Sequence, residues 1–148
     1  MNRPLRLLLR GSWGLLRLLL WIVGLGYLVL EAREVTAQRQ LTQITVFAVL
    51  FLVASFQMSM ARYLVSSPDA TEATSVLQSS LAMFSACLFS VLDGALDQLF
   101  LSLPVGAGGL VMPVLFLLNW AMNLLCVVLA LASIELFLAS MRRLILRF

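Results

Sequence analysis

The sequence predicts an all-α membrane protein: a polytopic bundle of four transmembrane helices with both chain ends on the cytoplasmic side. Three observations lead to this fold class. Hydrophobic residues make up 62% of the 148 residues and charged residues only 11%, with a mean hydropathy of +1.04. A soluble domain carries about a quarter charged residues, so most of this surface is expected to contact lipid. The other two observations are four long apolar runs and an excess of arginine near both ends.

The first ten residues are expected to form a short amphipathic helix in the cytoplasmic interface of the membrane. Arg3, Arg6, Arg10 and Arg17 are spaced by three, four and seven residues, so they share one face of a helix. The apolar run 11–30 follows and is the first predicted span. A secretory signal peptide also begins basic and then apolar, but no small-residue cleavage site follows this run, so we expect an uncleaved anchor.

The second predicted span is the apolar run 44–65, which is long enough to cross a bilayer. The polar segment 31–43 in front of it is expected to form a short helix outside the membrane. The segment 66–74 behind it is expected to be a loop, because it is polar and contains Pro68.

The third and fourth predicted spans are joined by a tight hairpin. Ser75 and Gln78 match a capping box, which predicts that the third helix begins there and spans 76–103. The glycine-rich segment 104–109 allows the chain to reverse. The fourth run, 110–141, would extend roughly 48 Å as a helix, so it must tilt or leave the hydrocarbon.

Arginines near the two ends orient these spans. Three stand in the first ten residues and three in the last seven: Arg3, Arg6, Arg10, Arg142, Arg143 and Arg147. Because arginine concentrates on the cytoplasmic side of membrane proteins, both ends are expected there, which requires an even number of crossings. Arginine without any lysine is compatible with a high-GC bacterium, so the expected localisation is a bacterial inner membrane.

Two pairs of polar residues are predicted to meet inside the membrane. Asp93 and Asp97 lie one turn apart in the third span, and Asn119 and Asn123 lie one turn apart in the fourth. Counted from the shared hairpin, Asp93 and Asn119 are each about ten residues, or 15 Å, deep. We therefore expect one connected cluster of four residues, in which amides donate to carboxyls. Its role is either to fix helix register or to bind protons or cations.

Arg17 and Glu135 are a second candidate pair. Each is about six residues, or 9 Å, from the expected cytoplasmic boundary, so an ion pair between the first and fourth spans is possible. The alternatives are that Glu135 meets a basic group on another subunit, or that both side chains extend separately to the interface.

The sequence argues against enzymes and cofactor proteins. It contains no histidine and no phosphate-binding loop, zinc-protease motif, nucleophile elbow or Cys-x-x-Cys pair. Cys87 and Cys126 lie in apolar runs and are expected to be buried thiols. No cofactor, metal or nucleic acid is expected; the expected partners are membrane lipids and other membrane subunits or further copies of the chain.

The function expected first is that of a non-catalytic subunit that anchors or scaffolds a larger membrane complex. The alternative is an oligomeric ion or proton channel that uses Asp93 and Asp97. A small immunity, sensing or defence protein would have the same sequence features as the first class, so this possibility stays open.

Overall fold

The computed structural model describes residues 14–15, 17–26, 36–66, 70–102 and 111–147, and the fold is given for these. They form three long helices, α2 (Thr36–Val65), α3 (Ala70–Ser102) and α4 (Val111–Arg147), and a shorter apolar helix, Arg17–Gly26. The described residues contain no strand. The predicted all-helical fold class is therefore confirmed for this part of the chain.

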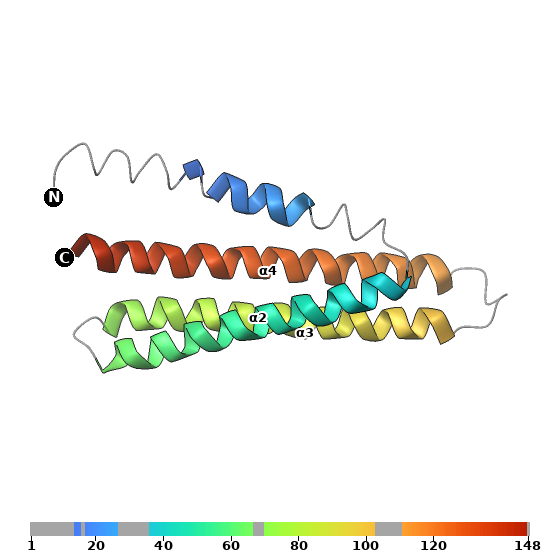
Figure 1. Ribbon diagram of the computed structural model, residues 1–148, viewed down its shortest axis with the longest axis horizontal. Helices are drawn as coiled ribbons and strands as arrows, with labels where there is room; N and C mark the ends of the chain where they lie inside the picture. Colours follow the sequence, from blue (N-terminus) through green and yellow to red (C-terminus); the bar gives the residue numbers. More distant parts are fainter. Residues whose placement is uncertain (1–13, 16, 27–35, 67–69, 103–110, 148) are drawn as a thin grey trace.

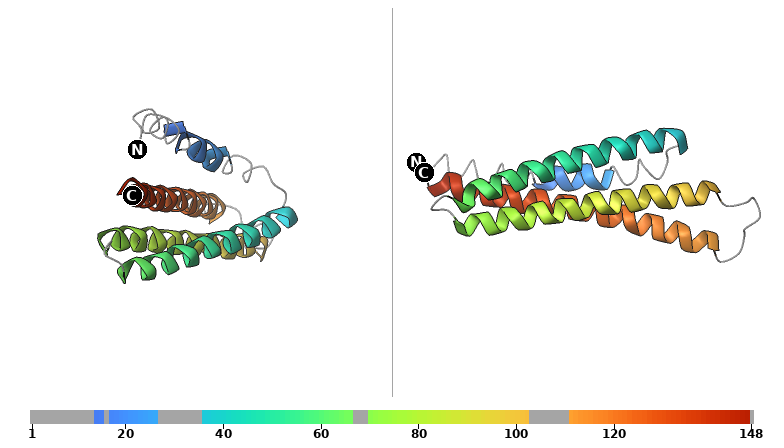
Figure 2. Two further views of the ribbon diagram at one scale, coloured as in Figure 1. Left: turned by 60° about the vertical axis from the view of Figure 1, so that its left-hand side comes forward. Right: turned by 90° about the horizontal axis from the view of Figure 1, so that it is seen from below.

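The helix α3 is the centre of the bundle. It packs against α2 on one side and α4 on the other, and the three helices run alternately up and down (Figure 1). The Arg17–Gly26 helix, which we call the short helix, lies beside α4 on the side away from α3 (Figures 1 and 2). The chain thus forms layers in which α4 separates the short helix from α3.

Among the described residues, three helices are long and apolar enough to cross a membrane: Gln43–Val65, Glu72–Leu99 and Pro113–Ile145 within α2, α3 and α4. The described part of the first predicted span is the shorter apolar helix Arg17–Gly26. The rest of that span lies outside the described residues, as does the predicted interfacial helix with Arg3, Arg6 and Arg10. Four crossings and two cytoplasmic ends therefore stay predictions.

The described part of the polar segment before the second span does not form the separate short helix that the sequence predicted. Residues 36–43 are instead the first turns of α2, which continues without interruption to Val65. The stretch Thr-Ala-Gln-Arg-Gln-Leu-Thr-Gln has no glycine or proline and contains mostly strong helix formers. The helix therefore continues through it, and this extension places Gln43 against α3.

The capping box predicted for α3 is wrong, because Ser75 lies inside the helix. The helix begins at Ala70 and carries Glu72 in its first turn, where a carboxylate is favoured by the helix dipole. The alanines and the glutamate of this turn are good helix formers, so the helix starts soon after Pro68. The fourth helix is also longer than predicted and continues to Arg147, since basic residues are favourable at a helix C-terminus.

Small side chains allow the close packing of α2 and α4 on α3. Buried alanines lie on α2 and α3: Ala54, Ala61, Ala73 and Ala86. Membrane helices pack through such small residues because van der Waals contact, rather than the exclusion of water, drives their association. Large apolar side chains are exposed on the outer faces, among them Leu52 and Phe56 on α2, as is expected where lipid is the solvent.

Candidate functional site

The predicted aspartates and asparagines lie together, and a glutamine joins them. Asn119 Nδ2 donates to Asp97 Oδ1 at 2.8 Å, and Asn123 Nδ2 donates to Asp93 Oδ1 at 2.9 Å. From α2, Gln43 Nε2 donates to Asp93 Oδ2 at 2.9 Å and to Asp97 Oδ2 at 2.6 Å. We call these five residues the carboxylate–amide cluster. It connects all three long helices through four hydrogen bonds from amides to carboxyls.

The register of the cluster differs by one helical turn from the prediction. Depth counted from the hairpin placed Asn119 level with Asp93, whereas Asn119 pairs with Asp97 and Asn123 pairs with Asp93. The reason is that the C-terminal end of α3 and the N-terminal end of α4 lie at unequal distances from the cluster. Five positions separate Asp97 from Ser102, and eight separate Val111 from Asn119.

Gln43 was missed because its sequence context is polar. It stands directly before the apolar run of α2 and was assigned to the segment outside the membrane. Its side chain is in fact buried, and its NH2 group has the two hydrogens that two carboxylates require. The unbroken run of helix formers from Thr36 was the one sequence signal that could have placed Gln43 in the second long helix.

The cluster lies next to a pocket between α2 and α3. This pocket has a volume of about 330 Å³ and is lined by Gln43, Ile44, Phe47, Ser90, Val91, Gly94 and Gln98. A methyl group at Gly94 would come within 3.4 Å of the Gln43 side-chain oxygen. This is an ordinary van der Waals distance, so the Gln43 side chain passes close to Gly94 without requiring a glycine there.

A second polar layer lies nearer the middle of the bundle. Ser133 Oγ on α4 lies 2.6 Å from the Ser79 carbonyl oxygen on α3 and 3.1 Å from Gln57 Oε1 on α2. Ser80 Oγ donates to the Ala54 carbonyl oxygen at 3.0 Å. We call Gln57, Ser79, Ser80 and Ser133 the serine layer. All four side chains are buried, so this layer also links the three long helices through polar contacts.

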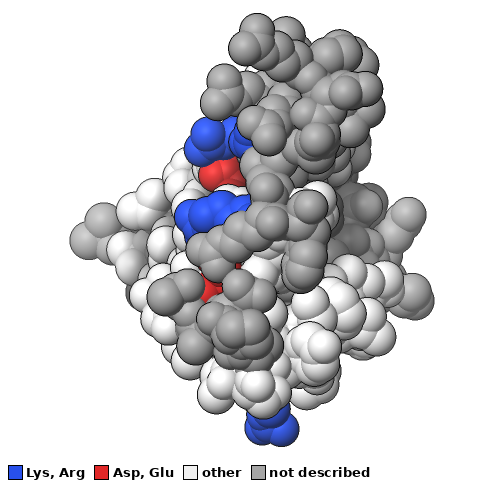
Figure 3. Space-filling view, turned by 90° about the vertical axis from the view of Figure 1, so that its left-hand side faces the viewer, with Lys and Arg blue, Asp and Glu red and all other residues white. Residues whose placement is uncertain are grey.

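An ion pair joins the start of α3 to the end of α4. Arg143 Nε donates to Glu72 Oε2 at 3.0 Å, and Arg143 Nη2 donates to Ser140 Oγ at 3.3 Å. Glu72 is buried while Arg143 is exposed. Viewed from this end of the molecule, basic and acidic side chains lie next to one another (Figure 3).

A layer of apolar side chains separates the carboxylate–amide cluster from the serine layer. It contains Met83, Ala86 and Cys87 on α3 and Cys126 and Val127 on α4, all of them buried. On α3 this layer lies between Ser80 and Ser90, a rise of about 15 Å. The cysteines form part of this packing as buried thiols. We call these five residues the apolar spacer.

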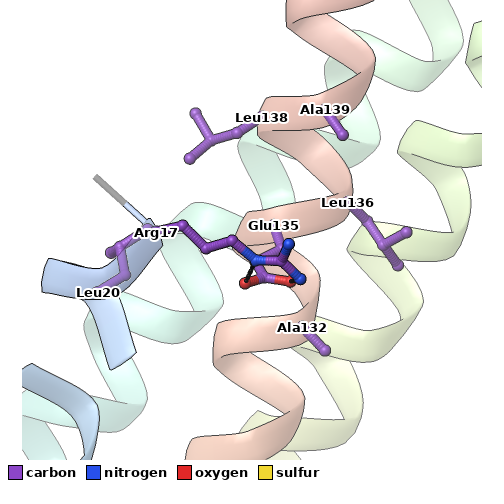
Figure 4. Close-up of a pocket in the computed structure, with 7 residues that line it drawn as sticks. All are labelled: Arg17, Leu20, Ala132, Glu135, Leu136, Leu138 and Ala139. Atoms are coloured by element: carbon purple, nitrogen blue, oxygen red, sulfur yellow. Dashed lines mark hydrogen bonds and ion pairs between the residues drawn. The ribbon is translucent and has the colours of Figure 1, made fainter. Parts of the chain in front are cut away.

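Arg17 and Glu135 also meet, and Trp21 takes part. Arg17 Nε and Nη2 donate to the two Glu135 oxygens at 2.6 and 3.0 Å, and Trp21 Nε1 donates to Oε1 at 2.7 Å. The Arg17 side chain extends from the short helix across to α4 (Figure 4). Arg17 is 63% exposed and Glu135 22%. The contact of Trp21 was not predicted, since the ring nitrogen of a tryptophan gives no sequence signal of a specific acceptor.

Gly24 lets the short helix approach α4 closely. A methyl group at this position would lie 2.7 Å from Leu131 Cδ1 and 3.2 Å from Val127 Cγ1. Together with Arg17, Leu20 and Trp21, Gly24 follows the three- and four-residue spacing of one helix face. This face is the side of the short helix that packs against α4.

The hydrogen bonds of the carboxylate–amide cluster and of the serine layer join the three long helices to one another. In the part of the chain that the structure describes, no group of three or more His, Cys, Asp or Glu residues could hold a metal ion. Comparisons with protein families, with curated proteins and with solved structures gave no match to this chain.

Proposed function

We propose that this chain is a non-catalytic subunit that anchors or scaffolds a larger complex in a bacterial inner membrane. The observation that carries the proposal is how polar and apolar groups are divided. Within the described residues, buried polar side chains join the chain's own helices at the carboxylate–amide cluster, the serine layer and the Glu72–Arg143 pair. The outer faces carry large apolar residues such as Leu52 and Phe56, which are 70% and 56% exposed. A bundle of this kind fixes the register of its own helices and presents apolar surface to other membrane helices.

The apolar spacer supports a structural role for the two interior polar layers. A path for protons or ions through one copy of the chain would need polar groups or water along its length. Met83, Ala86 and Val127 are buried between the two layers, over about 15 Å of helix. Each layer therefore serves best as a set of interhelical hydrogen bonds, which stabilise membrane proteins by roughly 0.6 kcal/mol each.

Site-specific photocrosslinking in native membranes tests the scaffold proposal. A photoreactive amino acid is placed at Leu52 or Phe56 on α2, and at Phe116 or Leu117 on α4, all exposed positions. We expect at least one helix to give a discrete protein adduct, identified by mass spectrometry. The unmodified chain is the control. If all four positions capture only lipid and the protein extracts in mild detergent as a stable monomer, the proposal is wrong.

A second function, an oligomeric ion or proton channel that uses Asp93 and Asp97, is favoured by one observation. The pocket between α2 and α3 is lined by Gln43, whose amide bridges both carboxyls, so a path from the bundle surface to the cluster is short. Several copies would be needed to enclose a pore. Flux through liposomes should then fall when Asp93→Asn and Asp97→Asn are combined, and unchanged flux would eliminate this function.

A further inference from the structure

Two polar groups in the pocket between α2 and α3 are buried but make no hydrogen bond within the described residues. Ser90 is 8% exposed, and its hydroxyl has neither a donor nor an acceptor in this part of the chain. Gln43 is 9% exposed and directs its amide hydrogens at Asp93 and Asp97, whereas its oxygen Oε1 has no donor among the described groups. Buried polar groups without partners are rare, so these two indicate a missing partner.

Ser90 differs from other serines of α2 and α3. Ser55, Ser59 and Ser85 each donate to the carbonyl oxygen four residues earlier, at distances of 2.8 to 3.0 Å, which is a common bond for a serine inside a helix. Ser90 makes no such bond within the described residues, and it lines the pocket. Its hydroxyl is therefore available both to donate to a bound molecule and to accept from it.

The oxygen of Gln43 lies on the pocket side of its amide group. Only the NH2 end of an amide can donate to the two aspartates, so Oε1 is directed away from them. It lies 3.4 Å from the position that a methyl group at Gly94 would occupy, and Gly94 lines the pocket four residues after Ser90. Four residues of helix rise about 6 Å, so one small group can lie between Oε1 and the Ser90 hydroxyl.

We propose that this pocket binds the hydroxyl group of a neutral molecule that is dissolved in the membrane. A hydroxyl is the simplest neutral group that donates to Gln43 Oε1 and at the same time accepts from Ser90 Oγ. None of the described residues that line the pocket is charged, so a phosphate or an ammonium group would lose its water there without gaining a counter-ion. The charged head groups of ordinary phospholipids are therefore poorly suited to the pocket.

The other walls of the pocket favour a ligand that arrives from the bilayer. Ile44, Phe47 and Val91 are apolar, and Ile44 and Val91 are 70% and 50% exposed on the surfaces of α2 and α3. The volume of about 330 Å³ is at the lower end of small-molecule sites, which have about 300–1,000 Å³. One turn of a helix about 10 Å across already occupies roughly 420 Å³, so a head group fits better than a partner helix. Diacylglycerols and quinols combine such a head group with an apolar tail.

Ligand binding by the full chain in phosphatidylcholine nanodiscs tests the proposal without any substitution. The probes are dioctanoylglycerol and an alkyl quinol kept reduced, and each is compared with its full methyl ether, which has no hydroxyl hydrogen. We expect at least one probe to raise the melting temperature in a saturable way, because a ligand of the folded state stabilises it. Its ether should bind about tenfold more weakly. The probe that binds identifies the source of the hydroxyl. If both probes bind no better than their ethers, water alone occupies the pocket and the proposal is overturned.

Two pairs of variants locate the bound molecule. Ser90→Ala removes the hydroxyl that lines the pocket, and Ser85→Ala removes an exposed hydroxyl of the same helix. Val91→Phe fills the pocket from its exposed side, and Val114→Phe adds the same ring at an exposed position of α4. The two members of each pair thus differ in whether the changed side chain lies at the pocket.

We expect Ser90→Ala to lower the affinity for the probe about fivefold, as for the loss of one hydrogen bond between neutral groups, and Val91→Phe to lower it at least as much. The two control variants should bind like the unchanged protein. If the pocket variants and their controls bind equally well, the proposal fails. Ser90→Ala and the unchanged chain decide the question should Val91→Phe not fold. Ligand binding is measured apart from protein adducts and ion flux, so its outcome is distinguishable from that of either proposed function.

Discussion

The single amide nitrogen of Gln43 serves two carboxyl groups. Asp93 and Asp97 stand one turn apart on α3, where like charges repel. The two hydrogens of the Gln43 NH2 group are directed at one oxygen of each. Asn119 and Asn123 supply the donors to the other oxygens, so the amides offset the cost of holding two carboxyls together.

We predict that Gln43→Leu destabilises the bundle more than a similar change at an exposed glutamine. Leucine fills a similar volume but removes both donors, so a buried acceptor on Asp93 and a partly buried acceptor on Asp97 each have one donor fewer, at a cost of about 1–3 kcal/mol. Thermal unfolding in nanodiscs measures the effect, with Gln98→Leu as the control on the exposed side of α3. Equal melting temperatures for the two variants would contradict the prediction.

The Arg17–Glu135 pair allows a charge-exchange test. Arg17→Glu or Glu135→Arg alone places like charges opposite one another, so each is expected to lower the melting temperature. The double variant restores opposite charges and should recover part of the loss. A double variant that is no more stable than the worse single variant would show that the contact of 2.6 Å between Nε and Oε1 contributes nothing to stability.

At the scale of helices, sequence patterns located the elements better than their ends. The apolar runs correspond to α2, α3 and α4 because each helix needs apolar side chains wherever it contacts lipid. Helix ends instead depend on local backbone preference, which is why α2 begins at Thr36 and α3 at Ala70. The pairing of Asp97 with Asn119 depends on the axial offset between α3 and α4. Residue positions in the sequence do not specify this offset.

The contact between the short helix and α4 predicts different effects of substituting two glycines of the short helix. Gly24→Leu should displace the short helix, because even a methyl group there would lie 2.7 Å from Leu131 Cδ1, and overpacking costs about 1–3 kcal/mol. Gly26→Leu is the matched control, since no atom lies within 4 Å of a methyl group at Gly26. Thermal unfolding of both variants provides the comparison; Leu131→Ala should rescue Gly24→Leu, and failure to do so would contradict the steric explanation.

At the scale of the whole molecule, the alternating helices predict which ends face the cytoplasm. Ser66 follows α2 at the end of the bundle where α4 finishes, and Ser102 closes α3 at the other end (Figure 1). With Cys87 and Cys126 replaced by alanine, Ser66→Cys should react with an impermeant thiol reagent from the cytoplasmic side, and Ser102→Cys from the opposite side. Labelling of both from one side would refute the proposed orientation.

The central position of α3 also has a consequence for the order of synthesis. The ribosome completes α2 and α3 before α4 exists, and chains generally assemble from the N-terminus. Asp93 and Asp97 therefore leave the ribosome before Asn119 and Asn123 do. Gln43, on the preceding helix, is the first of the cluster's amides that they can meet. A nascent chain that lacks this glutamine would expose two carboxyls to lipid for longer, so its insertion yield should fall even where the finished bundle is stable.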